Sequence, residues 1–282
     1  MRTQGLFCVV LAMFAFACGP SGRDPGGGGG GDGDGGVGVD ADPGGGGGGG
    51  GGGGPEVTYV YAHTASDLYK VDPDTLAITK VGTFAWSNGT DSMTDIAIDK
   101  TGLMLGVSFS AVYRIDPTNA VATRLSTGLS GTFNGLSFVP AAMLGTTGDD
   151  VLVGTRNADG VVFRIDPMTG QATTIGNMGG FSSSGDLVAV TNFGTVQTAD
   201  NGISNDRLVR LAPQTFAATA VGTDIGYSDI WGVAFWKDKI FGFTASGQFV
   251  TIDPTTGAGT LVQSNGPAWW GAAVTTSAPV IF

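Results

Sequence analysis

One phrase occurs five times in the sequence, at intervals of 44, 50, 46 and 41 residues between its central pairs, and this repetition limits the possible folds more than any other feature. Each copy is a short segment ending in Asp-Pro (Ala-Pro in the fourth copy) followed by a second segment rich in Thr, Ala and Val. Proline ends a strand, and an Asp side chain stabilises the turn that follows it. The phrase therefore predicts five hairpins of two antiparallel strands: LYKVDPDTLAITKVG (68–82), VYRIDPTNAVATRLS (112–126), VFRIDPMTGQATTIG (162–176), LVRLAPQTFAATAVG (208–222) and FVTIDPTTGAGTLVQ (249–263).

Two further strand-like segments precede each phrase except the first. The segments directly before the phrases are LMLGVSF (103–109), VLVGTR (151–156), GTVQTAD (194–200) and KIFGFTA (239–245). The segments before those, which we expect to be innermost, are DIAIDK (95–100), GLSFVP (135–140), DLVAVT (186–191) and GVAFWK (232–237). A period of about 45 residues with four strands per unit is typical of a β-propeller blade.

The first unit begins with VTYVYAH (57–63) and lacks an innermost strand, whereas WGAAVTT (270–276) follows the last hairpin and matches the innermost type. A C-terminal strand that completes the first blade would remove the open sheet edges of the ring. The sequence therefore predicts an all-β domain over residues 56–282. Its fold is expected to be a five-bladed β-propeller, with four antiparallel strands per blade and closure by the C-terminal strand.

The repeat pattern over residues 57–276 resembles the broad NHL and YWTD-like class of propellers, and it looks like uncharacterised repeat lipoproteins of bacteria. The YWTD tetrapeptide and the NHL signature themselves are absent. Because propellers carry many unrelated functions, the resemblance implies an architecture and no particular activity.

The first seventeen residues have the pattern of a secretory signal peptide. Arg2 precedes an apolar run from Leu6 to Ala17, which is shorter than the roughly 20 residues of a membrane-spanning helix. The segment Ala15-Phe16-Ala17-Cys18 resembles the bacterial lipobox, which implies that Cys18 becomes lipidated after cleavage. Cys8 and Cys18 are the only cysteines, so Cys18 would be the sole thiol of the processed chain. The alternative is an ordinary signal peptide cleaved after Ala17.

Residues 18–55 form a Gly- and Asp-rich segment that includes an unbroken glycine run from Gly44 to Gly54. Glycine has the largest backbone entropy and no side chain to bury, so we expect a disordered linker behind the lipid-anchor cysteine. A flexible coil of this length would reach roughly 30–36 Å. The net charge of −11 argues against a nucleic-acid partner, because surfaces that bind DNA are basic.

The loops that lead into the innermost strands should meet around the central axis on one face, which we call the rim. Carboxylates, an amide and tryptophans are concentrated in these loops, and aromatic faces flanked by Asp and Asn suit sugars. The candidate ligand-binding residues are Asp95, Asn134, Asp186, Asp229, Trp231, Trp269 and Trp270. The alternative is that the tryptophans plug the channel as part of the core.

Few residues suited to catalysis are present. His63 is the only histidine and is expected away from the rim, the 56–282 domain has no cysteine, and no histidine cluster suggests zinc. We therefore predict no catalytic residue, no metal and no other cofactor. A glycoside hydrolase that uses Asp95, Asp186 and Asp229 stays open as a second alternative, although such enzymes usually use Glu as the acid and Glu56 is the only glutamate.

Four of the five phrases carry a basic residue two positions before the turn pair: Lys70, Arg114, Arg164 and Arg210. A ring of cations could bind anions. The simpler expectation is a structural ion pair between each basic side chain and the Asp of the following turn, because the two lie on the same face of the strand.

Together these patterns predict an exported, lipid-anchored propeller that acts as a binding or scaffold module of the cell envelope. We expect it in the outer membrane or at the cell surface, with a periplasm-facing position as the alternative. A lectin-like sugar binder that uses the rim tryptophans is the first functional alternative. The expected partner is an unknown protein or glycan, membrane contact is through the lipid anchor only, and the chain is expected to be a monomer.

Overall fold

A computed structural model describes residues 60–200 and 205–281. The expected signal peptide, Cys18 and the Gly-rich segment lie outside the described residues. The described part contains 21 strands and one short 3-10 helix, η1 (Ala141–Leu144). Within it, no helix has both the length and the hydrophobicity needed to cross a bilayer.

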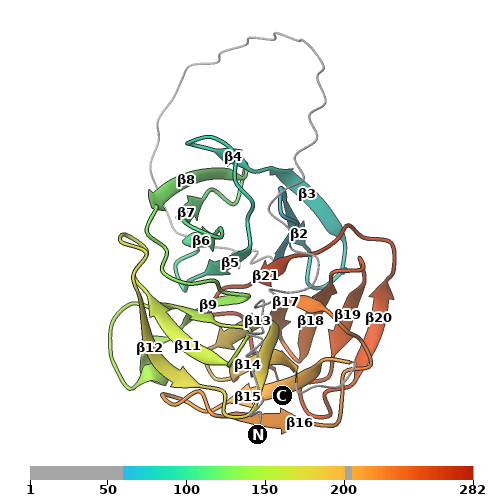
Figure 1. Ribbon diagram of the computed structural model, residues 1–282. Coiled ribbons are helices and arrows are strands. Elements are labelled where there is room, and N and C mark those ends of the chain that lie inside the picture. The colour runs from blue at the N-terminus through green and yellow to red at the C-terminus, as the bar shows by residue number, and fades with distance from the viewer. Residues whose placement is uncertain (1–59, 201–204, 282) are drawn as a thin grey trace, which may run out of the picture.

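The strands form five separate sheets arranged around a common centre, so the chain folds as the predicted five-bladed β-propeller (Figure 1). Blade 1 pairs β21 (Gly271–Ala273), β1 (Val60–His63), β2 (Asp67–Val71) and β3 (Ile78–Thr83). Blade 2 pairs β5 (Asp95–Ile98), β6 (Met104–Val107), β7 (Val112–Ile115), β8 (Val121–Ser126) and β4 (Ala85–Trp86).

The other three blades each contain four strands. Blade 3 has β9 (Gly135–Val139), β10 (Val151–Thr155), β11 (Val161–Ile165) and β12 (Ala172–Asn177). Blade 4 has β13 (Ser182–Val190), β14 (Gly194–Asp200), β15 (Arg207–Leu211) and β16 (Ala218–Val221). Blade 5 has β17 (Ile230–Trp236), β18 (Lys239–Thr244), β19 (Phe249–Ile252) and β20 (Gly259–Gln263).

The first blade joins the two ends of the described chain. β21 pairs antiparallel with β1, and the register places Ala62 opposite Ala272 and His63 opposite Gly271. The innermost strands β5, β9, β13, β17 and β21 contact one another in that order, and β21 contacts β5 in turn. The last strand therefore lies between the innermost strands of blades 5 and 2.

The Asp-Pro pairs form the turns expected from the sequence. Asp72 Oδ1 accepts hydrogen bonds from the backbone N–H groups of Asp74 and Thr75, and Asp253 Oδ1 accepts the same pair from Thr255 and Thr256. The residue four positions after the Asp, or after Ala212 in the fourth copy, has a positive φ in each turn, whether or not it is glycine: these residues are Leu76, Ala120, Gly170, Phe216 and Gly257. The outer-strand pairing, together with the Asp cap where the turn has one, thus holds a left-handed residue in place even where the sequence has no glycine.

Blade 2 differs from the prediction of four antiparallel strands, because it has a fifth strand that runs parallel to its neighbour. In β4, Ala85 lies opposite Val121 of β8 and Trp86 lies opposite Ala122. The Trp86 ring packs edge-on against Tyr113 with the ring centroids 4.9 Å apart. β4 covers an edge that would otherwise expose unpaired backbone groups.

Candidate functional site

The rim residues predicted from the sequence come together at the start of the innermost strands, but almost all of them are buried. The residues with an exposed fraction of at most 9 % are Asp95, Asn134, Asp186, Trp231, Trp269 and Trp270. Asp229 alone is exposed, and it has a left-handed φ of 53°. Most of the predicted rim residues therefore belong to the buried core, at the end where the innermost strands begin.

The tryptophan rings pack against other aromatic rings. Trp269 is fully buried, and its centroid lies 5.1 Å from that of Tyr69 and 5.4 Å from that of Phe243. Trp231 and Trp270 meet edge-on with their centroids 6.4 Å apart. No flat ring face is left open for a sugar at Trp269, so the arrangement matches the plug alternative.

Asp186 is fully buried and binds backbone groups from four innermost strands. Its Oδ1 accepts hydrogen bonds from the N–H groups of Leu187 (2.7 Å) and Leu136 (3.2 Å). Its Oδ2 accepts from the N–H groups of Val233 and Ala272, both at 3.3 Å. One carboxyl therefore links β13, β9, β17 and β21 at the axis, which is a structural role.

His63 lies beside Asp95, so the expectation that it would be away from the rim was wrong. His63 Nε2 is 3.7 Å from Asp95 Oδ1, and both side chains are fully buried. The register explains this position, because His63 pairs with Gly271 at the rim end of β21. A Cβ atom on Gly271 would meet both Asp95 Oδ1 and His63 Nε2.

The His63–Asp95 pair lacks the nucleophile that a catalytic triad needs. His63 Nδ1 is 2.8 Å from the carbonyl oxygen of Thr64, and a carbonyl only accepts, so Nδ1 donates. No side chain among the described residues hydrogen-bonds to His63 Nε2. The pair therefore supports no nucleophilic catalysis.

A second buried polar group lies between blades 3 and 4, and Asn134 is its only member that was predicted from the sequence. Gln197 Nε2 donates to Ser183 Oγ (2.6 Å) and Thr155 Oγ1 (2.7 Å), and Asn134 Nδ2 donates to the carbonyl of Ser183 (2.9 Å). The available signal was the lone Gln in GTVQTAD, an otherwise apolar and small-residue strand. Within the described part of the chain, no three His, Cys, Asp or Glu side chains are grouped so as to hold a metal ion.

Two buried carboxyls near the rim have raised pKa values, which predicts how stability depends on pH. Burial and then the charge of Asp95 raise the pKa of Asp186 well above its usual value, and burial raises the pKa of Asp206 from 3.8 to about 6. A carboxyl whose pKa is higher in the folded state than in the unfolded state stabilises the fold fully at pH values below its unfolded-state pKa. This stabilisation is lost as the pH rises through its folded-state pKa. We therefore expect the free energy of unfolding to fall between about pH 4 and pH 7, with about 3 kcal/mol from Asp206 alone.

Urea unfolding at pH 4.5 and pH 7 measures this effect. The Asp206→Asn variant should lose the part of the pH dependence that comes from Asp206. An unfolding free energy that is flat or rises over this interval would show that these two groups do not set the pH dependence.

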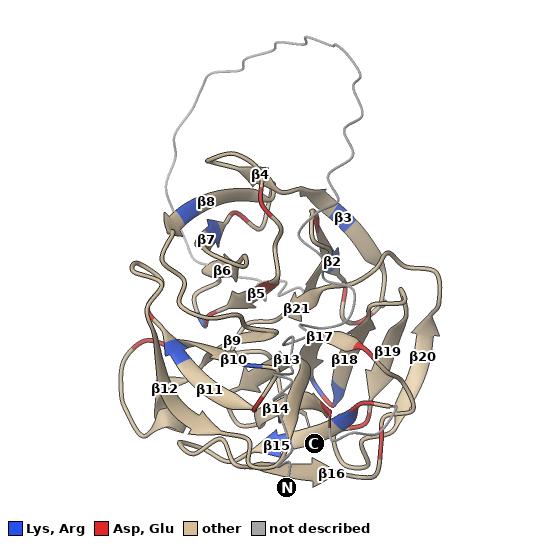
Figure 2. Cartoon of the chain, in the orientation of Figure 1, with Lys and Arg blue, Asp and Glu red and all other residues tan. Residues whose placement is uncertain are grey.

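The open polar surface lies instead on the hairpins of the repeated phrase. Figure 2 shows basic residues on the third and outer strands, including β2, β7, β8, β11 and β15. In every blade the position of the basic residue faces a threonine across the hairpin. The pairs are Lys70 with Thr79, Arg114 with Thr123, Arg164 with Thr173, Arg210 with Thr219, and Thr251 with Thr260.

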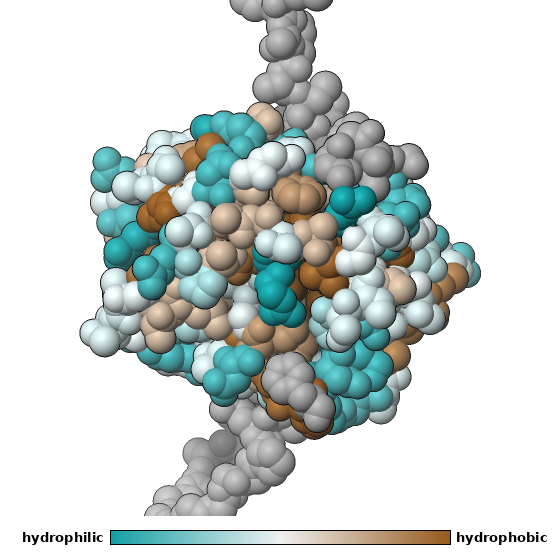
Figure 3. All heavy atoms as spheres, turned by 90° about the horizontal axis from the view of Figure 1, so that it is seen from below, coloured by the Kyte–Doolittle hydropathy of each residue, from teal (hydrophilic) through white to brown (hydrophobic). Residues whose placement is uncertain are grey.

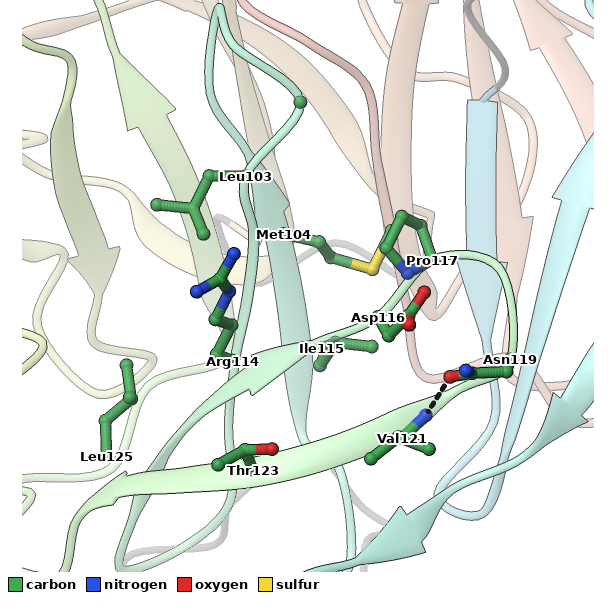
Figure 4. Close-up of a pocket in the computed structure, with 11 residues that line it drawn as sticks. Leu103, Met104, Arg114, Ile115, Asp116, Pro117, Asn119, Val121, Thr123 and Leu125 are labelled. Atoms are coloured by element: carbon green, nitrogen blue, oxygen red, sulfur yellow. Dashed lines mark hydrogen bonds between the residues drawn. The ribbon is translucent and has the colours of Figure 1, made fainter. Parts of the chain in front are cut away.

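Grooves lie at these hairpins in blades 2, 3 and 5. The groove of blade 2 has a volume of about 610 Å³ and is shown in Figure 4; its lining is Gly102, Leu103, Met104, Arg114, Ile115, Asp116, Pro117, Asn119, Val121, Thr123 and Leu125. The groove of blade 3 has about 790 Å³ and includes the equivalent Arg164, Asp166 and Thr173. The smaller groove of blade 5, about 200 Å³, has Thr251, Asp253 and Thr260.

The expected ion pair between the basic residue and the turn Asp does not form in blades 2 and 3. Arg114 and Arg164 are exposed, and their guanidinium groups make no hydrogen bond or ion pair among the described residues. Hydrogen bonds from Thr118 lower the pKa of Asp116, and the charge of Arg114 adds to this effect without direct contact. Each strand instead turns its guanidinium toward solvent at the groove.

Comparison with known proteins adds little beyond the fold. No family model matches the chain, and the resemblance to the NHL and YWTD-like classes therefore stays a prediction from the sequence. No curated protein matches it either. Among solved structures it is similar to BamB from Moraxella catarrhalis, with a TM-score of 0.37 and 15% identity over 73% of this chain and 59% of that chain. The chain thus spans about three-fifths of that protein, and a likeness of this degree transfers no function.

Proposed function

We propose that the chain is an exported, lipid-anchored propeller that acts as a binding or scaffold module of the cell envelope. The anchor rests on the apolar run from Leu6 to Ala17 and on Cys18 behind it. The Gly-rich segment up to Pro55 would give the propeller room to reach partners away from the membrane.

The observation that supports a binding role best is how the polar residues at the centre are used. Asp186 holds four strands through backbone N–H groups, and His63 and Asp95 are enclosed against Gly271. The polar side chains at the centre thus hold the blades together, and the exposed polar side chains lie on the outer hairpins. A rigid ring with function on its surface suits a module that binds.

The rest of the described surface is mixed in character. On the face in Figure 3, hydrophilic and hydrophobic residues are interspersed. The large hydrophobic side chains that are exposed lie apart from one another in the sequence: Val121, Met168, Leu261 and Ile281. Single exposed hydrophobic side chains are common on protein surfaces and by themselves mark no binding site.

Neither alternative from the sequence has a specific observation in its favour. A lectin built on the rim tryptophans needs open ring faces, and Trp269 has none. A glycoside hydrolase needs two carboxyls that reach a substrate, whereas Asp95 and Asp186 are both fully buried.

Metabolic labelling with a fatty acid tests the proposed location. We expect the full chain to incorporate the label and to fractionate with membranes, and we expect Cys18→Ser to lose the label and leave the membrane fraction. Cys8→Ser, which lies inside the expected signal peptide, is the matched control and should have no effect on labelling. A wild-type chain without label, or a Cys18→Ser chain that keeps it, would refute the anchor.

A further inference from the structure

We propose that the grooves of blades 2 and 3 are two copies of one binding site for a neutral, hydroxyl-rich saccharide chain. The inference rests on the proposed binding function and names the ligand class and the site. It places the sugar on the outer hairpins, away from the rim tryptophans.

The side chains of the blade 2 groove match the hydrogen bonding of a sugar. Arg114 offers only donors, the carboxylate of Asp116 offers only acceptors, and the hydroxyl of Thr123 offers both. Asp116 Oδ1 is occupied by the backbone N–H and hydroxyl of Thr118. Neighbouring sugar hydroxyls both donate and accept, so they can satisfy a guanidinium and a carboxylate in one groove.

Apolar side chains beside these polar groups complete the match. In Figure 4, Leu103 and Leu125 lie to either side of Arg114, and both are partly exposed, whereas Ile115 is buried in the core. Aliphatic side chains of this kind contact the CH-bearing faces of a sugar ring. The volume of about 610 Å³ is within the roughly 300–1,000 Å³ of ligand sites.

The charges of the two grooves argue against an anionic ligand. The blade 2 groove contains one cation, Arg114, and one anion, Asp116. The blade 3 groove contains Arg164 with Asp149, Asp150 and Asp166. Neither has a net positive charge, and the whole chain carries −11, so a phosphate-rich or acidic polymer would be repelled.

A peptide added as an extra strand does not fit blade 2. Peptides of this kind pair with the open edge of a sheet. The outer edge of β8 is already paired with β4 at Val121 and Ala122, its first two residues, and the backbone N–H of Arg124 donates to Ser87 Oγ. The start of β8 is therefore closed to an added strand, and the groove beside it offers side chains to a ligand.

The two grooves lie along one path, so a single chain could occupy both. A third hollow of about 430 Å³ shares Leu125 with the blade 2 groove. The same hollow includes Met168 and Thr169, which directly follow the Asp166-Pro167 pair of the blade 3 groove. Two linked sites on one polymer raise its overall affinity above that of either site.

Blades 1, 4 and 5 lack part of this set, and blade 1 has Lys70 where blades 2 and 3 have an arginine. In blade 4, Arg210 Nη1 donates to the carbonyl of Phe193 (2.9 Å), and Ala212 stands where the turn Asp would be. In blade 5, Thr251 replaces the cation. The repeated phrase thus keeps an open guanidinium and a turn carboxylate together in blades 2 and 3.

Binding of the full chain to immobilised oligosaccharides tests the proposal. The probes are neutral gluco-, xylo-, manno- and galacto-oligosaccharides and a uronic-acid oligosaccharide of equal length. We expect the wild type to bind at least one neutral series, and we expect Arg114→Ala to weaken that binding roughly tenfold. Arg114→Ala/Arg164→Ala should weaken it further. Arg114→Lys should also bind weakly, because an ammonium cannot reproduce the planar fork of donors.

Arg156→Ala is the charge-matched control, since Arg156 pairs with Asp159 outside the blade 2 groove and is not among the residues of the blade 3 groove. It should bind like the wild type, and all variants should keep the wild-type melting temperature. The proposal is overturned if no neutral series binds, if only the uronic-acid probe binds, or if the arginine variants bind like the wild type. Fatty-acid labelling that still depends on Cys18 would then leave the envelope role standing.

Discussion

Gly271→Val is expected to destabilise the propeller more than other single changes on its surface or in its turns, with a fall in melting temperature of about 6–12 °C. Gly271 is the first residue of β21, and an added Cβ would meet Asp95 Oδ1 and His63 Nε2. Both of these side chains are fully buried, so neither can move into solvent. Overpacking combined with disruption of buried polar groups should cost about 3 kcal/mol, and 1 kcal/mol shifts the melting temperature of a domain of this size by about 2–4 °C.

Gly89→Ala is the matched control for this change. Gly89 has a positive φ of 73° but open space around its Cβ position, so its replacement tests backbone strain without a clash. We expect it to cost about 1 kcal/mol. If Gly271→Val melts no lower than Gly89→Ala, then the His63–Asp95–Gly271 contact is not as tight as described.

Asp186→Ala is expected to have a similarly large effect, because it removes one acceptor from four strands at once. The backbone N–H groups of Leu187, Leu136, Val233 and Ala272 would all lose their partner. Each buried donor left unsatisfied costs about 1–3 kcal/mol, so the loss should be at least about 4 kcal/mol even if water replaces part of the carboxyl. Urea unfolding monitored by tryptophan fluorescence measures it.

Asp238→Ala is the control for Asp186→Ala, since Asp238 is exposed and contacts only the neighbouring Lys239 by side chain. We expect a change of less than about 0.5 kcal/mol there. An Asp186→Ala protein with the stability of the Asp238→Ala protein would contradict the role assigned to the central carboxyl.

The repeated phrase was sufficient to predict the blades, because a hairpin signal that recurs with a propeller period leaves few other architectures. Asp72 and Asp253 cap their turns as expected. The segments expected to be innermost correspond to β5, β9, β13 and β17, with shifts of a few residues at their ends. These features depend on local patterns, and local patterns can be read from the sequence.

The features that the sequence did not predict depend on contacts between distant segments. β4 has only two residues, Ala85 and Trp86, and no periodicity can identify so short a strand. The position of His63 depends on its register with Gly271, which lies at the other end of the domain. The burial of Trp269 depends on Tyr69 and Phe243, which belong to two different blades.

The basic residues illustrate the same limit. Strand alternation placed Arg114 on the face of Asp116, but alternation does not set the distance between two side chains. Among the residues that the structure describes, Arg114 makes no ion pair; it is exposed and lies at the groove where we propose the saccharide site.

Hydrogen exchange of the full chain, followed by mass spectrometry, tests most directly the central claim that the first and last strands of the domain pair. We expect peptides covering β21 (Gly271–Ala273) and β1 (Val60–His63) to exchange as slowly as the peptide covering β17 (Ile230–Trp236), since β21 and β17 belong to the central ring and β1 is paired on both sides, with β21 and β2. Exchange of β21 and β1 at the rate of exposed loops, with β17 still protected, would mean an open arc of blades and would contradict the account.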